Sequence, residues 1–277
     1  MDEAERLPAL VALWWEAIDS FTHLREAVGE DQWHAPTDLP GWDVHAVVAH
    51  TAHVEALLAG GRHEDVEVGE VPHAHGMMGT FTEQGVVARR DASPDDLITE
   101  IRESATARHT ALLADPPDDP TVAAPGLFGA IGWSTETLLR NRPLDVWMHE
   151  QDVRRAIDRP GNLDCAAAIY STDYLLQSVP FVLAKRAGAP AGTTVRVEVA
   201  GHAPLTAVVG EDGRGRIADE RVPDDAPGAQ PSATIATDRE TFVLLAGGRR
   251  EAAPGAVRTS GDTDLAARML GALAVTP

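Results

Sequence analysis

The sequence predicts a protein of two parts, a bundle of helices followed by a small α+β unit. In the first part, apolar residues recur every three or four positions, which is the spacing of helices with one buried face. After a linker-like stretch at 188–192, apolar and polar residues alternate, as in half-buried strands. We therefore expect a helical domain over residues 1–187 and an α+β domain over residues 188–277.

The helices of the first part are predicted from their spacing and their end signals. The first spans 7–28 and stops at Gly29, and the second spans 44–58, with Asp43 as its N-cap. Pro143 is expected to kink the helix at 134–157, because proline has no backbone N–H to donate. Further helices are expected at 82–90, 96–113 and 134–157.

A fifth long helix, at 166–186, is expected to lead into the second part. The stretch 219–231 is rich in proline, glycine and acidic residues and is expected to be an irregular loop. The remaining elements of the α+β unit are strands at 193–199, 205–209 and 232–237 and helices at 239–246 and 262–273.

Composition excludes several classes of partner. The 43 acidic and 23 basic residues give a formal net charge of −20, which opposes binding to nucleic acid or to anionic membranes. The single cysteine, Cys165, cannot form an intramolecular disulfide or a cysteine cluster for zinc. Because the N-terminus is acidic and no apolar run is long enough to span a membrane, we expect a cytoplasmic protein.

The most informative segment is 142–152, in which Asp145, His149 and Asp152 stand at positions i, i+4 and i+7. Helical side chains at this spacing share one face. These polar groups stand among apolar residues, so burying them is costly unless something compensates, and a divalent metal is the usual compensation. The segment therefore predicts a metal site.

The second predicted helix offers a further ligand from His45, His50 and His53. His50 lies between valines and is expected to face inward, level with Asp145 and His149 of a neighbouring helix. For any one of these histidines alone, the competing interpretation is a side chain satisfied by hydrogen bonds. Three N and O ligands with an open fourth position are typical of a catalytic zinc, although other divalent metals fit the same donors.

The roles of the neighbouring acidic residues stay open. Asp152 is a ligand, a partner of Arg154 or Arg155, or an acceptor that orients a ligating imidazole, and we favour the last. Glu150 is either a group that contacts substrate or an interhelical polar contact.

Three other side chains are candidates for binding the substrates. Arg89 and Arg249 suit the recognition of carboxylates, since a guanidinium offers paired donors, but we favour exposed salt bridges as the explanation of each. Trp147 flanks the proposed ligands and either lines the pocket or belongs to the core.

Two segments, Leu39–His50 (LPGWDVHAVVAH) and Arg142–Arg155 (RPLDVWMHEQDVRR), carry a resemblance to a known family. They are similar to the mycothiol-dependent maleylpyruvate isomerase family, within the DinB-like metalloenzyme superfamily. The pattern at 261–268 (GDTDLAAR), with the segments at 238–242 and 246–249, resembles the sterol-carrier-like domain that these proteins append.

The resemblance implies a DinB-like four-helix bundle followed by a sterol-carrier-like α+β domain. It also implies one zinc ion held by His50, Asp145 and His149, with mycothiol as co-substrate. The reaction implied is isomerisation of a small electrophile, or transfer of the thiol to it. The family isomerase has glutamate at the carboxylate position, so Asp145 is shorter by one methylene.

Two alternatives differ in reaction class. In the first, zinc-bound water makes the protein a hydrolase, with Glu150 or Asp152 as base, and activity needs no thiol. In the second, the metal only staples the helices and the protein binds a ligand without catalysis. The expected partners are a small-molecule thiol and an electrophilic substrate, and the sequence leaves monomer and dimer equally open.

Overall fold

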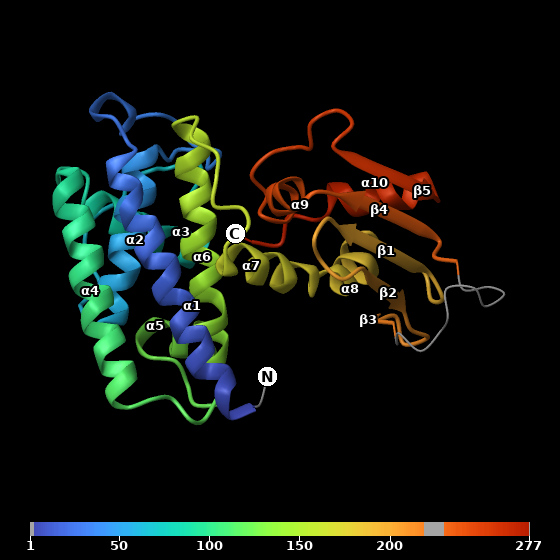
Figure 1. The fold of residues 1–277 in the computed structure, drawn as a ribbon, viewed down its shortest axis with the longest axis horizontal. Coiled ribbons are helices and arrows are strands. Elements are labelled where there is room, and N and C mark those ends of the chain that lie inside the picture. Colours follow the sequence, from blue (N-terminus) through green and yellow to red (C-terminus); the bar gives the residue numbers. More distant parts are fainter. Residues whose placement is uncertain (1–2, 219–229, 277) are drawn as a thin grey trace. The chain divides into compact units, whose positions relative to one another are not determined.

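The computed structural model describes residues 3–218 and 230–276, and the chain forms two compact units (Figure 1). The first comprises Met1–Asn162 and Ala166–Ala168, and the second Leu163–Cys165 and Ile169–Pro277. The division thus falls near residue 165 and not after residue 187, where we expected it. The physical reason is that the chain after Ala168 packs with the sheet of the second unit.

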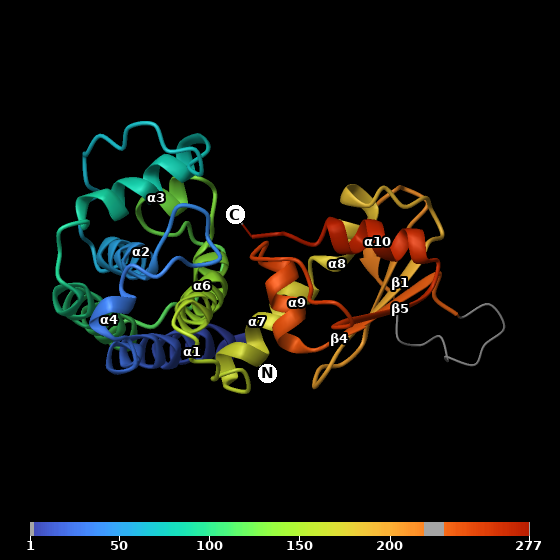
Figure 2. The same ribbon diagram turned by 90° about the horizontal axis from the view of Figure 1, so that it is seen from above.

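Four long helices make up most of the first unit, and two shorter ones, α3 and α5, complete it. Helix α1 packs against α4 and α6, and α2 packs against α3, α4 and α6, so that α2 and α6 are neighbours (Figure 2). The helices are α1 (Glu3–His23), α2 (Val44–Leu58), α3 (Gly76–Ala88), α4 (Pro94–Ala114), α5 (Gly126–Ala130) and α6 (Thr135–Ala156).

Three of the long helices begin at a residue whose side chain caps the helix, and the cap of α2 is the one predicted. Asp43 caps α2 by accepting from the N–H of Ala46, and Ser93 caps α4. Ser134 caps α6, and that helix continues through Pro143. Helix α3 starts six residues before the expected 82, and α5 was not predicted, because neither stretch carries a buried apolar stripe that marks a helix in sequence.

The second unit contains a five-stranded sheet in the order β3-β2-β1-β4-β5. Strands β1 and β4 are parallel, and the other neighbouring pairs are antiparallel. Burial alternates along β1 and β4, and helix α10 packs on β4. The elements are β1 (Thr194–Val199), β2 (Leu205–Val209), β3 (Gly215–Ile217), β4 (Ala233–Thr237), α9 (Arg239–Ala246), β5 (Val257–Gly261) and α10 (Thr263–Gly271).

Mixed helix and sheet content confirms the predicted α plus α+β class, and two details differ. Strands β3 and β5 were missed because they are mostly exposed and polar. The helix expected at 166–186 breaks into α7 (Ala166–Leu176), α8 (Val179–Phe181) and a π-turn, and Pro180 removes one hydrogen-bond donor at the break. Of the predicted loop at 219–231, residues 219–229 lie outside the described part of the chain.

Among the helices formed by the described residues, none combines the length and the apolar content that crossing a bilayer requires.

Candidate metal centre

The neighbouring helices α2 and α6 bring three of the predicted side chains together. His50 comes from α2, and Asp145 and His149 come from α6. One ligand atom from each residue lies within 4.8 Å of the other two, and the rings of His50 and His149 meet edge to face with centroids 5.0 Å apart. Nε2 of His149 is 3.7 Å from Oδ1 of Asp145. These distances leave room for one cation among the three groups.

The state of these groups suits a divalent cation. Nδ1 of His50 is buried and has no hydrogen-bond partner among the described residues. Burial, reinforced by the neighbouring His149, lowers the pKa of His50 from 6.5 to about 3, so the imidazole is neutral and keeps a lone pair. Burial alone would raise the pKa of Asp145, but Arg142 and the two histidines outweigh it and hold that pKa well below its usual range. Two imidazoles and one carboxylate are a donor set that zinc favours.

Asp152 contacts His149 and is not part of the cluster. Its Oδ2 lies 3.2 Å from Nδ1 of His149, and because an ionised carboxylate can only accept, the proton of the imidazole is on Nδ1. Nε2 of His149 is the nitrogen that faces Asp145. The other oxygen, Oδ1, accepts from Arg155 at 2.6 Å, and Arg155 also pairs with Asp38.

A buried network of charges contacts the oxygen of Asp145 that does not face His149. Arg142 donates to Oδ2 of Asp145 at 2.7 Å and to Glu55 at 2.6 Å. Glu55 also accepts from the indole N–H of Trp14 at 3.1 Å and lies 3.7 Å from Arg108. The guanidinium of Arg142 thereby occupies one oxygen of Asp145 and leaves Oδ1 for a metal.

Trp42, in the turn before α2, covers the two histidines. Its ring centroid lies 5.0 Å from that of His50 and 6.3 Å from that of His149. Its indole N–H donates to Glu83 of α3 at 2.9 Å, which fixes the ring in place. Glu83 also contacts His73 at 3.0 Å, so the loop before α3 reaches this covering group.

Two residues predicted for the site have other contacts. Glu150 is fully buried, and its carboxylate accepts from Arg154 at 2.7 Å and from Asn162 at 2.9 Å. Trp147 is fully buried, and its N–H donates to the carbonyl of Asn162. The structure therefore gives Glu150 a buried ion pair, and it assigns Trp147 to the core.

The two arginines predicted to bind substrate are both engaged with their own chain. Arg89 is buried and pairs with Glu64 and Glu100, each at 2.6 Å. Arg249 belongs to the second unit and donates to the carbonyl of Gly247 at 2.6 Å.

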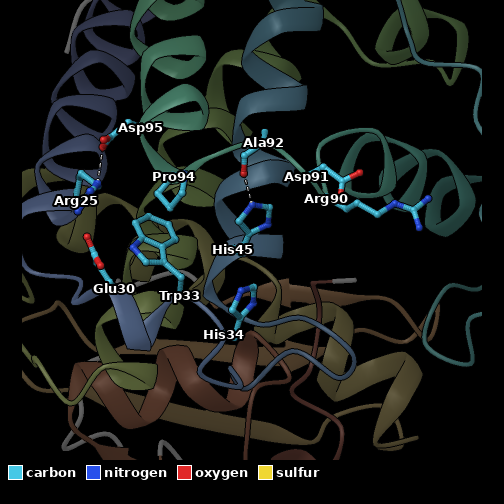
Figure 3. Close-up of a pocket in the computed structure, with 10 residues that line it drawn as sticks. All are labelled: Arg25, Glu30, Trp33, His34, His45, Arg90, Asp91, Ala92, Pro94 and Asp95. Atoms are coloured by element: carbon cyan, nitrogen blue, oxygen red, sulfur yellow. Dashed lines mark hydrogen bonds and ion pairs between the residues drawn. The ribbon is translucent and has the colours of Figure 1, made fainter.

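A surface pocket of about 400 Å³ lies elsewhere in the helical unit, and the three clustered side chains do not line it (Figure 3). Several of its polar groups are already paired. Arg25 contacts Asp95 at 2.7 Å, and Nε2 of His45 contacts the carbonyl of Ala92 at 2.9 Å. The chemistry of the cluster and not the size of this pocket identifies the candidate site.

Two helices that bring two imidazoles and a carboxylate together define a helical protein with a candidate metal centre and a separate α+β unit. Comparison with known families makes the assignment specific. Residues 14–154 match the mycothiol maleylpyruvate isomerase N-terminal domain, and residues 171–268 match the C-terminal domain of the same family. The chain therefore belongs to the mycothiol-dependent maleylpyruvate isomerase family, a class of thiol-utilising isomerases.

Solved structures agree in fold. A crystal structure of the mycothiol-dependent maleylpyruvate isomerase and one of its histidine-to-alanine variants each match with a TM-score of 0.56 at 15% sequence identity. Each match covers 92% of this chain and 92% of that one. Among curated proteins, none matches this chain in a sequence comparison.

The lowered pKa of His50 predicts how the metal-free protein responds to acid. We expect its imidazole to stay neutral throughout the range of about pH 5 to 8 in which an ordinary histidine titrates. Because the unfolded chain takes up this proton near pH 6.5 and the folded chain only near pH 3, His50 makes the fold less stable as pH falls between these values. NMR of the ring, assigned with His50→Gln, measures the titration, and a midpoint above about pH 5 would contradict this account.

Proposed function

We propose that this protein is a zinc-dependent enzyme that uses a low-molecular-weight thiol, mycothiol, to isomerise or modify a small electrophilic substrate. The observation that carries the proposal is the meeting of His50, Asp145 and His149 between α2 and α6, in a chain whose two halves match the two domains of the isomerase family. On the same grounds we propose that the helical unit is a DinB-like four-helix bundle and that the second unit is sterol-carrier-like.

His50, Asp145 and His149 would hold the zinc. When bound, zinc supplies a Lewis acid that favours the ionised form of a thiol. Asp152 keeps the Nδ1 proton of His149 and so directs its Nε2 toward the site. Arg142 neutralises the oxygen of Asp145 that does not face the site, and Trp42 excludes water from the two imidazoles.

The positioning role of Asp152 predicts a measurable loss. We expect Asp152→Asn to weaken zinc binding by roughly ten- to a hundredfold, since partners that orient ligating histidines usually contribute that much. An Asn side chain can instead offer its N–H₂ to Nδ1, which moves the imidazole proton to Nε2. Equilibrium dialysis of the purified variant against a competing chelator measures the change. Unaltered affinity would show that Asp152 does not orient the ligand.

The proposed chemistry is tested by turnover with and without thiol. Zinc-loaded protein is offered a panel of small unsaturated acids and other electrophiles, with mycothiol or with no thiol. The proposal expects conversion only when thiol is present. Conversion that persists in its absence would instead identify a hydrolase using zinc-bound water, and zinc binding without any conversion in either condition would favour a binding protein.

A further inference from the structure

A second group of metal-ligating side chains lies beyond His50 on the same helix. It consists of His53 from α2 and of His63 and Glu64 from the loop that follows. Nε2 of His53 is 3.1 Å from Nδ1 of His63 and 3.1 Å from Oε2 of Glu64, and the last two atoms are 3.9 Å apart. None of these residues belongs to the first cluster.

The three distances match one face of a tetrahedral metal site. Ligand bonds of about 2.0–2.1 Å at tetrahedral angles separate neighbouring ligand atoms by about 3.3 Å. Two of the observed separations are slightly shorter and one is longer, so a small adjustment of the exposed His63 would centre a cation. The fourth position would be open to water, because His63 and Glu64 are partly accessible to solvent.

Hydrogen bonds around His63 direct a lone pair into this group. The amide N–H₂ of Gln84 donates to the carbonyl of Val66, so its oxygen is the atom that faces Nε2 of His63 at 2.8 Å. An amide oxygen only accepts, which puts the proton of His63 on Nε2 and leaves the lone pair on Nδ1. Nδ1 is the nitrogen that faces His53. This arrangement is the usual support of a ligating histidine.

Glu64 and His53 are also disposed for a cation. Arg89 takes up Oε1 of Glu64 at 2.6 Å, while Oε2 is buried and has no hydrogen-bond donor among the described residues. His53 is fully buried, and its Nε2 lies 3.1 Å from this oxygen. Gly85 of α3 closes the opposite side of the ring, since a Cβ there would lie 2.0 Å from Nδ1 of His53. Nε2 is thus the nitrogen of His53 that faces His63 and Glu64. In the metal-free protein it shares a hydrogen bond with Nδ1 of His63, which a cation between them would replace.

We propose that His53, His63 and Glu64 form a second site for a late first-row divalent metal such as zinc, separate from the His50, Asp145 and His149 site. Binding there joins the loop after α2 to the helix itself. The proposal does not depend on the thiol reaction. Its donor set of two imidazoles and one carboxylate excludes a preference for calcium or magnesium, which favour oxygen ligands.

Metal stoichiometry of the full chain tests the proposal. The protein is stripped with chelator, titrated with zinc or cobalt(II), and freed of unbound metal before elemental analysis. We expect His63→Ala to bind one equivalent of metal less than the unchanged protein. The double variant with His149→Ala, in which the first site is already disabled, should likewise bind one equivalent less than His149→Ala alone. Gln84→Leu should weaken the affinity for the metal ion at this second site by roughly ten- to a hundredfold, because it removes the acceptor that fixes the tautomer of His63.

The matched control is His75→Ala, which removes an exposed histidine further along the same loop and should leave the stoichiometry unchanged. Circular dichroism checks that each variant folds, and Glu64→Gln replaces His63→Ala if that variant does not. Loss of one equivalent in either variant, with none lost in the control, supports the second site. The same number of bound ions in the ligand variant and the unchanged protein would overturn it.

Discussion

Replacing His149 with alanine is expected to lower thiol-dependent turnover at least about a hundredfold and to reduce bound zinc by one equivalent. His149 is the side chain on which the site converges, since Nε2 faces Asp145 and its ring meets that of His50. Its loss leaves two protein ligands, fewer than the three typical of catalytic zinc sites. Initial rates at saturating thiol, together with elemental analysis of the same preparation, measure both effects.

The control for this variant is His23→Ala at the C-terminal end of α1. The His23 side chain is 57% exposed and contacts only Asp19, in its own helical turn, among the described residues. It should keep full activity and full metal content. If His149→Ala retains both its zinc and its turnover, the three clustered residues are not the catalytic site.

Replacing Glu55 with alanine is expected to destabilise the fold by about 3–5 kcal/mol, the largest effect on stability that we foresee. Glu55 is fully buried, and it is the carboxylate that Arg142 and Arg108 share. Arg142 is 2% exposed and Arg108 7% exposed, so removing Glu55 leaves positive charge in the interior without its carboxylate partner. Arg142 would keep only Asp145. Urea unfolding of the metal-free proteins measures the change.

A surface ion pair provides the control for this prediction. Glu136 pairs with Arg6, whose side chain is 36% exposed, and Glu136→Ala should cost no more than about 1 kcal/mol. The two substitutions remove the same charge and differ in burial. A loss below about 1 kcal/mol for Glu55→Ala as well would mean that the buried arginines find other compensation, and that the network does not hold Asp145 in place.

The helices that carry the site were predictable because their signals are local. Asp145, His149 and Asp152 repeat at helical spacing, and Asp43 is a cap read directly from the sequence. Predicting that His50 faces α6 required one further assumption, namely that α2 and α6 are neighbours.

Features that join distant parts of the chain were not predictable in the same way. Glu55 meets Arg142 across 87 positions, and no periodic pattern relates them. His63 and Glu64 lie in a loop, and loop sequences show no periodic pattern of apolar residues. The second cluster was therefore not predicted, apart from His53 as a candidate ligand. The contact of Glu150 with Asn162 was not predictable for a similar reason, because Asn162 comes from the chain beyond α6.

The most direct test of the central claim is a crystal structure of zinc-loaded protein with anomalous data collected at the zinc edge. We predict an anomalous peak at bonding distance, about 2.0–2.2 Å, from one nitrogen of His50, one oxygen of Asp145 and Nε2 of His149. Zinc-replete crystals in which these three side chains enclose no anomalous density, or in which they lie too far apart to share one ion, would contradict it.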